Sequence, residues 1–311
     1  MFTLFDFEDL IEQQLHHNQD RSLFYEPVDG QGVLSPSRET VYFIKYRPNE
    51  IANFIRSASL NGTTQYLIEY TANKTIQLFI RANQYLDFSR QDYRQLQHIY
   101  EGLFERVDRL CRQEETFDEE IDHLFRSHYK NLQAYLLESN GNEIFKKYRE
   151  SPNVFAVKCT EYSPEFQMRL LRIDVSTIEQ PVIDIGCGQQ GSLVHFLREN
   201  GIESYGMDRS AWNITYLHQA NWFDCTFVPG TWGTAISHMA FSNHFMHHHL
   251  RSDGDYKRYA KKYMEILQSL KLGGSFTYAP SLSFMEEILI SSTESYTVEA
   301  NAYSTKVTRI K

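Results

Sequence analysis

The first half of the chain shows mainly the three-to-four-residue spacing of apolar positions that is typical of amphipathic helices. The spacing is clearest over 89–110, where Ser89 is the expected N-cap, and again over 117–136. Acidic residues cluster near the start of the second stretch, where the helix dipole favours negative charge. We therefore expect two long helices here, packed as an antiparallel hairpin.

The other elements of this half are shorter and less clear. Two segments fit either a hairpin or a helix, because short apolar runs are ambiguous; they are 66–70 and 75–80. The remaining expectations are a helix over 5–15, a loop over 27–37, a strand over 41–46 and a helix over 48–55. Chain breakers around Asn140 and Pro152 end the helical run, so we expect a mainly helical domain over 1–155 and a second domain over 156–311.

The second half alternates short apolar runs with helical spacing, after a helix that Ser163 caps and Pro164 begins. Strands are expected at 182–185, up to 208, at 225–228, 234–241 and 275–279, and twice within 296–310. Helices are expected after 192, and over 212–220, 257–270 and 284–290. This alternation predicts an α/β fold built on a doubly wound, mostly parallel sheet.

One stretch, Pro181–Ser210, joins these patterns to candidate chemistry. An apolar run interrupted by Asp184 leads into glycines spaced G-x-G-x-x-G, from Gly186 to Gly191, and then into helical spacing. Glycines at such a turn let the backbone approach a nucleotide-like ligand closely. Asp208 ends the next apolar run, where a carboxylate can accept hydrogen bonds from both hydroxyls of a ribose.

Two kinds of cofactor suit a strand–glycine turn–helix unit of this kind. In a dinucleotide site the pyrophosphate lies over the turn, and a carboxylate at the end of the first strand would repel it. S-adenosylmethionine has no phosphate and carries a sulfonium cation and an amino group, which Asp184 would attract. We therefore expect S-adenosylmethionine as the cofactor and keep a nicotinamide-dependent oxidoreductase as the alternative.

The sequence D-x-G-x-G, followed downstream by Met207-Asp208, resembles the class I (Rossmann-like) S-adenosylmethionine-dependent methyltransferases. The resemblance covers roughly residues 163–311. It implies a methyltransferase that acts on a small molecule or a peptide side chain, with the N-terminal domain shaping the pocket for the methyl acceptor. It also implies an antiparallel last strand, which the closing hairpin within 296–310 would supply. A binding module without catalysis remains open as a further alternative.

The resemblance implies where the cofactor would be bound. Residues of the first two strands and the turn would hold it: Asp184, Gly186, Cys187, Gly188, Asp208 and Arg209. Tyr162 and Gln167 would reach it from the preceding helix, and Ser237 and His238 would line the methionine side. The expected third strand has no acid at its tip, so backbone groups around Gly230 and stacking by Trp232 are expected to hold the adenine instead.

Asn243 and His244 are the candidate catalytic residues, because the loop after the fourth strand lies where an acceptor would bind. The run S-N-H-F is weakly similar to the D/N-P-P-Y/F loop of amino-directed methyltransferases but lacks both prolines. His244 would serve as a general base where the acceptor must lose a proton. Its spacing from His248 also fits a metal site on a helix, but no H-E-x-x-H pattern is present, so we expect no metal.

Charge and composition limit the partners and the compartment. The net charge is −9, and the half up to residue 165 holds 18 Lys+Arg against 26 Asp+Glu, which makes a nucleic-acid partner unlikely in this interpretation. The acidic N-terminus lacks the basic region of a signal peptide, and no apolar run is long enough to span a bilayer. The 4 cysteines lack C-x-x-C spacing, which favours free thiols in the cytoplasm. The pattern gives no information on the oligomeric state.

Overall fold

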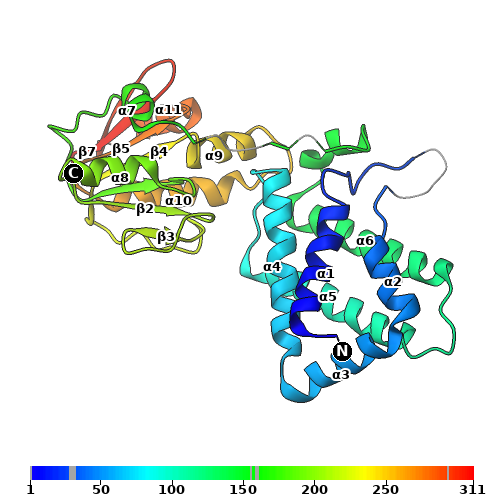
Figure 1. Ribbon diagram of the computed structural model, residues 1–311. Helices are drawn as coiled ribbons and strands as arrows, with labels where there is room; N and C mark the ends of the chain where they lie inside the picture. The colour runs from blue at the N-terminus through cyan, green and yellow to red at the C-terminus, as the bar shows by residue number, and fades with distance from the viewer. Residues whose placement is uncertain (1, 28–32, 155, 158–160, 293) are drawn as a thin grey trace. The chain divides into compact units, whose positions relative to one another are not determined.

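The computed structural model describes residues 2–27, 33–154, 156–157, 161–292 and 294–311 (Figure 1). Spatial clustering divides the chain into two compact units, Met1–Cys159 and Thr160–Lys311, against a boundary expected after residue 155. Of the four cysteines, Cys111, Cys187 and Cys225 are free thiols, and Cys159 lies outside the described residues.

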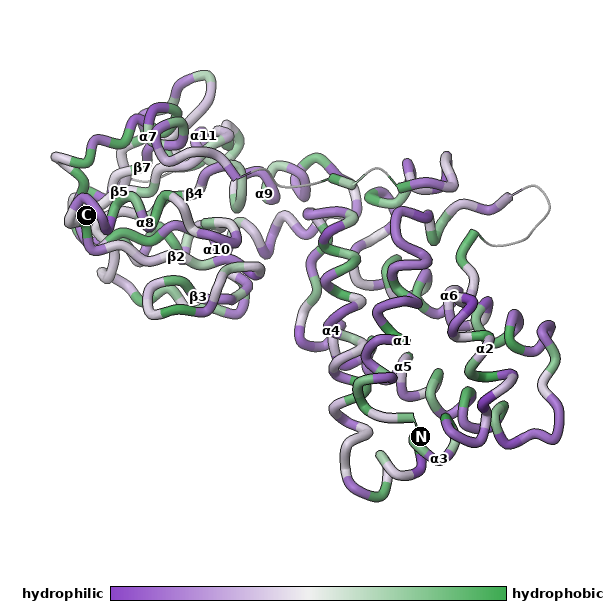
Figure 2. The backbone as a smooth tube through the Cα atoms, viewed as in Figure 1, coloured by the Kyte–Doolittle hydropathy of each residue, from purple (hydrophilic) through white to green (hydrophobic). Residues whose placement is uncertain are grey.

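The N-terminal unit is helical, as expected. Apolar and polar residues alternate along its amphipathic helices, which Figure 2 shows for α1 and α4. Its elements are α1 (Leu4–His17), α2 (Arg38–Tyr46), α3 (Pro48–Asn61), α4 (Thr64–Ala82), α5 (Arg90–Leu110), α6 (Asp118–Asn140) and two 3-10 turns, Glu143–Phe145 and Lys147–Arg149.

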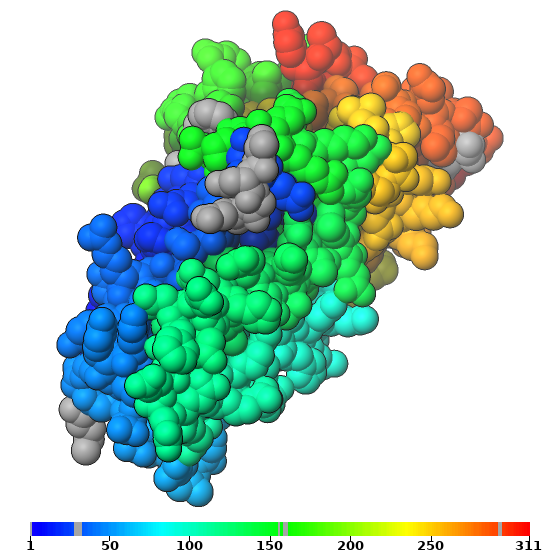
Figure 3. Space-filling model, turned by 90° about the vertical axis from the view of Figure 1, so that its right-hand side faces the viewer, coloured from blue at the N-terminus to red at the C-terminus, as the bar shows by residue number. Residues whose placement is uncertain are grey.

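The predicted hairpin of long helices is confirmed. Gln95, near the start of α5, donates to Glu138 near the end of α6, and Arg106, near the end of α5, donates to Ser127 in the first half of α6, so the two helices run antiparallel. Leu96 and Ile121 are fully buried between the helices of this unit. Part of the outer surface of the pair is visible in Figure 3, in teal and green.

One expectation for this unit needs correction, and one open alternative is resolved. The strand expected at 41–46 is part of α2, where the Ser37 side chain caps the helix and Thr40 and Ile44 are buried one turn apart. The ambiguous segments 66–70 and 75–80 are both helical and lie within α4. In each case residues spaced four apart pack against the core, so helical periodicity outweighed the local β-branched character.

The C-terminal unit is built on a seven-stranded sheet with the order β3-β2-β1-β4-β5-β7-β6. Strands β1 to β5 run parallel to one another, and β7 is antiparallel to both β5 and β6. The strands are β1 (Val182–Ile185), β2 (Ser204–Asp208), β3 (Leu217–Gln219), β4 (Trp232–His238), β5 (Leu270–Ala279), β6 (Tyr296–Ala300) and β7 (Thr305–Arg309).

Helices cover both faces of this sheet (Figure 1), so the doubly wound α/β fold of the class I methyltransferase type is confirmed. Val182 and Ile236 pack with α7 (Pro164–Leu171) and α8 (Ser192–Glu199). Ile183 and Ile185 face the opposite way, toward α9 (Phe241–His249), α10 (Tyr256–Gln268) and α11 (Ser283–Ser292). Because side chains alternate along a strand, Asp184 lies on the same face as Val182, which is the α7–α8 side.

The third strand is not where the sequence pattern placed it. The structure has β3 at Leu217–Gln219, paired with the outer edge of β2, whereas residues 225–228 form no strand. The helix expected over 212–220 is likewise absent, and Trp212 and Ile214 are exposed. Leu217 is fully buried against α8, so it packs as a strand residue although its spacing from its neighbours is helical.

Candidate functional site

The glycine turn 186–191 lies at the point where the strand order of the sheet reverses. Strands β2 and β3 follow on one side of β1, and β4 and β5 follow on the other. Ligands of open α/β sheets bind beyond the carboxyl ends of the strands at such a point. Gly186 has φ +84°, and a Cβ there would lie 2.2 Å from the Cβ of Ala240. No other residue type fits at Gly186 without moving the start of α9.

The first amides of the turn are bound by residues of β2. The N–H groups of Gly186 and Cys187 donate to the carbonyl of Met207, at 2.8 and 3.2 Å. The N–H of Gly188 donates to Oδ2 of Asp208, also at 3.2 Å. Asp208 thus contacts the turn from the tip of the neighbouring strand, and its expected contact with ribose hydroxyls stays a prediction.

The next two amides are bound by a carboxylate that the sequence did not single out. Oε1 of Glu161 accepts from the N–H of Gln189 at 2.8 Å and from the N–H of Gln190 at 3.3 Å. The same side chain lies over Gly188, where an added Cβ would be only 3.0 Å from Oε1. The turn amides from Gly186 to Gln190 therefore all have acceptors within the protein.

Asp184 is the most deeply buried acid of the site. Asp184 is 2% exposed and pairs in register with Gly206 on β2, where the side chains of Cys187 and Leu217 fill the position that a Cβ would take. Burial, and secondarily the charge of Asp208, raises the pKa of Asp184 to about 7. Among the described residues, none donates a hydrogen bond that would offset this effect. A cation beside Asp184 would restore its ionised form.

Three carboxylates converge on the glycine turn. Burial raises the pKa of Cys187 strongly, and the charges that raise it further are those of Asp184, Asp208 and Glu161. Every charge that shifts this thiol is thus negative. A site surrounded in this way favours a positively charged ligand over an anion.

The remaining polar groups at the tip of β2 face the loop that follows. Oδ1 of Asp208 accepts from the backbone N–H and the hydroxyl of Ser210, at 2.8 and 2.7 Å, which fixes the orientation of the carboxylate. Arg209 is half-buried, and its charge lowers the pKa of His244 on α9. The structure therefore brings Arg209 into electrostatic range of the candidate catalytic histidine.

Tyr162 and His238 meet at the carboxyl end of β4. The Tyr162 ring contacts His238 edge-on, with 4.9 Å between centroids, and stacks with Phe166 at 5.2 Å. Gln167, also expected in the site, donates to the carbonyl of Tyr162 at 2.8 Å and so holds this segment in place. Burial lowers the pKa of His238 to about 4, so the ring is neutral at pH 7.

Ser237 has a structural role rather than the ligand contact that we expected. It is fully buried, donates to the carbonyl of Ile185 at 2.8 Å and accepts from the N–H of Phe241 at 3.0 Å. A hydroxyl has a single hydrogen to donate, and here β1 receives it. Ser237 therefore joins the ends of β1 and β4 to the start of α9.

Trp232 lies at the wrong edge of the sheet for the adenine contact that we expected. It is the first residue of β4, pairs with Leu270 at the start of β5, and contacts the Tyr205 ring near the start of β2. The ligand site is at the other ends of these strands. The expectation was wrong because it depended on the misplaced third strand, which would have put Trp232 in a loop at the ligand edge.

His244 lies close to the turn, buried on α9. Its ring meets the Trp222 ring edge-on at 5.1 Å, and Trp222 in turn lies 3.7 Å from where a Cβ on Gly186 would be. Burial and the nearby charge of Arg209 hold the pKa of His244 well below its usual range, so the ring is neutral. Asn243 is half-buried and, as the adjacent helical residue, points roughly 100° away from His244.

Four residues of the site escaped the sequence interpretation: Glu161, Ala240, Asn221 and Trp222. Glu161 belongs to no motif, and only the fold brings it to the turn. Asn221 and Trp222 follow β3 after a single residue, so a correct position for that strand would have revealed an amide near its tip. Asn221 accepts from the N–H of Phe223 at 3.0 Å, which orients its side chain.

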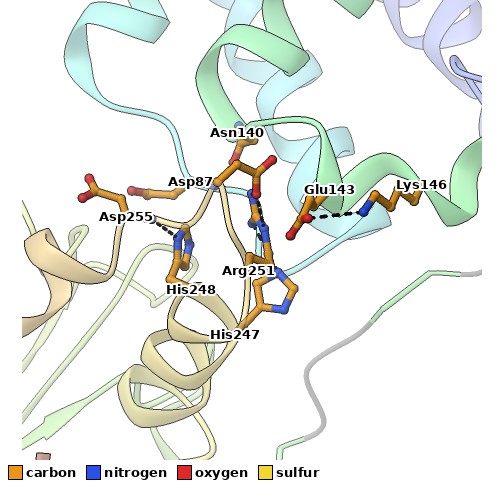
Figure 4. Close-up of polar contacts among 9 residues, drawn as sticks. Asp87, Asn140, Glu143, Lys146, His247, His248, Arg251 and Asp255 are labelled. Atoms are coloured by element: carbon orange, nitrogen blue, oxygen red, sulfur yellow. Dashed lines mark hydrogen bonds and ion pairs between the residues drawn. The ribbon is translucent and has the colours of Figure 1, made fainter. Parts of the chain in front are cut away.

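The histidine-rich end of α9 packs against the neighbouring helices. His248 stacks on Tyr259 and accepts from the N–H of Asp255 at 3.1 Å, a contact drawn in Figure 4. His249 stacks on Phe284, with 3.7 Å between ring centroids. Within the described ranges, the His, Cys, Asp and Glu side chains form no group of three that is suited to a metal ion.

Comparisons with known proteins give only distant matches. No family model matches the chain, and no curated protein matches it. A solved structure of a putative S-adenosylmethionine-dependent methyltransferase from Listeria monocytogenes is similar to 47% of this chain and 98% of its own, with 12% identity and a TM-score of 0.34. An rRNA methylase from Streptococcus thermophilus matches 49% of this chain and 100% of its own, at 13% identity and a TM-score of 0.31.

A third solved structure, an S-adenosylmethionine-dependent methyltransferase from Bacteroides fragilis, contains S-adenosyl-L-homocysteine. It is similar to 46% of this chain and 77% of its own, with 13% identity and a TM-score of 0.31. Similarity this low does not determine an activity, so the function must be argued from the residues of the site. Of the helices in the described ranges, none combines the length and hydrophobicity that crossing a bilayer requires.

Proposed function

We propose that the C-terminal unit binds S-adenosylmethionine and that the protein is a methyltransferase. The observation that carries this proposal is the glycine turn surrounded by carboxylates. In a dinucleotide site the turn amides donate to a pyrophosphate. Here Asp208 and Glu161 already accept from the last three of these amides, and Asp184 adds a further buried acid. These features favour a cationic adenosyl compound and disfavour the nicotinamide alternative.

The residues at the site fit the parts of such a cofactor. Asp208, at the tip of β2, has the position and the acceptor oxygens to bind ribose hydroxyls. Asp184 and Glu161 are available to the amino group and the sulfonium. Asn221, an amide just beyond β3, takes the role toward the adenine edge that we first assigned to Trp232. The narrow contact between Gly186 and Ala240 brings backbone close to the ligand.

When bound, S-adenosylmethionine supplies a methyl group activated by its positive sulfur. The protein's part is to exclude water and to orient the acceptor, which contributes effective molarities of about 10⁵ M or more in good cases. His244 is neutral and lies beside Trp222, so its ring has a lone pair for an acceptor that must lose a proton, although its lowered pKa makes it a weaker base than a free histidine. Asn243 is retained as a candidate to orient the acceptor, on its position alone.

The acceptor that we propose is a small molecule or a peptide side chain. The N-terminal half has an excess of acidic over basic residues, which disfavours long polyanions. RNA nevertheless belongs in any acceptor screen, because one of the similar solved structures is an rRNA methylase.

Transfer of a tritium-labelled methyl group from S-adenosylmethionine to a broad acceptor panel, RNA included, tests the activity. We expect label on one acceptor class and a strong loss with Asp208→Ala, checked for folding by circular dichroism. Cofactor binding without transfer to any acceptor class would instead favour the non-catalytic binding module. Absence of S-adenosylmethionine binding would refute the proposal.

A further inference from the structure

We propose that Glu161 is a specificity residue that keeps phosphate-bearing adenine nucleotides out of the glycine turn. Its carboxylate occupies the position over the turn amides that a phosphate of such a nucleotide would need. The identity of the ligand that binds in place of such nucleotides, S-adenosylmethionine, rests on the function proposed above. The exclusion of phosphates does not, because it follows from the contacts of Glu161 alone.

Glu161 is an exposed residue, but its carboxylate lies directly over the turn. One of its oxygens accepts from two consecutive amides, those of Gln189 and Gln190, at 2.8 and 3.3 Å. Its Cγ and Cδ lie 3.1 Å from where a Cβ on Gly188 would be, so the side chain lies against the glycine itself. A phosphate cannot reach these donors unless Glu161 leaves.

The segment that carries Glu161 is held in place. The next residue, Tyr162, packs its ring against His238 at the end of β4, and its carbonyl accepts from Gln167 at 2.8 Å. Displacing the carboxylate therefore means disturbing packed aromatic rings or rotating a side chain away from two hydrogen bonds. Charge acts in the same direction, because Glu161 stands with Asp184 and Asp208 around Cys187.

Glu165 provides a matched control. It lies four residues further along, in the first turn of α7, and its side chain is exposed. Its removal changes the net charge of the protein by the same amount as removal of Glu161. Among the described residues, the hydrogen-bond partners of Glu165 are Ser163 and its own backbone, which lie outside the glycine turn 186–191.

The experiment is calorimetric titration of the full-length protein with ADP at low ionic strength, repeated with Glu161→Ala, Glu161→Gln and Glu165→Ala. Glutamine keeps the shape of the side chain and an acceptor oxygen but removes the charge. We expect both Glu161 variants to bind ADP at least about tenfold more tightly than the natural protein, since a like charge next to the anion is lost. Added salt should weaken the gained affinity, and Glu165→Ala should leave ADP affinity unchanged.

Unchanged ADP affinity in both Glu161 variants would overturn the inference, and so would an equal gain in Glu165→Ala, which would show a general charge effect. Glu161→Gln carries the test if Glu161→Ala does not fold. Titration of the same proteins with S-adenosylmethionine separates the two proposals. If the natural protein fails to bind S-adenosylmethionine while the Glu161 variants gain affinity for ADP, the proposed function fails and this inference stands.

Discussion

The buried carboxyl of Asp184 predicts that affinity for S-adenosylmethionine depends on pH. Burial raises its pKa to about 7 in the ligand-free protein. A cation held beside it favours the ionised form, so its pKa falls when the cofactor binds. Below pH 7 binding must therefore release a proton from Asp184. For one proton released, affinity rises about fifteenfold between pH 5.5 and pH 7.

Calorimetry at several pH values, each in two buffers of different ionisation enthalpy, measures both the affinity and the number of protons released. The matched variant is Asp184→Asn, which cannot ionise. We expect its affinity to vary little between pH 5.5 and pH 7, to approach that of the natural protein at pH 5.5 and to fall well below it at pH 7. Identical pH profiles for the two proteins would refute the assignment of Asp184 to the cation.

The same pKa predicts the effect of this variant on stability. The folded-state pKa of Asp184 lies above its ordinary value of 3.8, so ionisation disfavours the folded state as pH rises from about 4 through 7. Asp184→Asn removes this penalty. The ligand-free variant should thus be more stable than the natural protein at pH 7.5, by at most about 4 kcal/mol, with little difference at pH 4.

Four further predictions concern other residues. Gly186→Ala should destabilise the protein by about 1–3 kcal/mol because of its positive φ, and further because the new Cβ meets Ala240. Ala240→Gly in the double variant relieves only the steric contribution, so thermal unfolding of the single and double variants separates the two contributions. Equal melting temperatures for these two variants would contradict the steric contribution. Asp208→Ala should weaken S-adenosylmethionine binding about tenfold or more in calorimetry while the fold is kept; unchanged affinity would remove it from the site. His244→Ala should slow labelled-methyl transfer about 10²-fold or more with nearly unchanged cofactor affinity; equal rates would exclude it as a base. Burial lowers the pKa of His128 to about 3 from 6.5, so the free energy of unfolding should fall as pH drops from 6.5 toward 3. His128→Leu should remove about 3 kcal/mol of the loss between pH 6.5 and pH 4, measured by urea unfolding with far-UV circular dichroism. An unchanged dependence of stability on pH in the variant would refute this.

The glycine turn and its two flanking strands could be predicted because local chemistry determines them. Gly186 requires a backbone conformation and a closeness to Ala240 that only glycine permits, and that requirement is visible as a motif. Asp184 and Asp208 stand at strand ends, and the apolar runs before them mark those strands. The pair of long helices in the N-terminal half, α5 and α6, could be predicted because each has a long apolar stripe.

The third strand and the residues that depend on it could not be predicted in this way. Leu217 and its neighbours pair with β2 over only three residues, too few to produce an alternating pattern. Because the third strand was misplaced, Trp232 was expected at the wrong end of the sheet and Asn221 was not identified. Glu161 reaches the turn through tertiary packing alone, from a position 28 residues before Gln189, so no local pattern could reveal it.

The central claim is that the cluster of carboxylates at the end of β1 selects a cationic adenosyl compound over one that carries a diphosphate. Calorimetric titration of the natural protein with S-adenosylmethionine, NAD⁺ and NADH, in one buffer at pH 7.5, tests it most directly. We predict saturable binding of S-adenosylmethionine at one site and no measurable heat of binding for either nicotinamide coenzyme. Binding of NAD⁺ or NADH with S-adenosylmethionine inert would contradict the account.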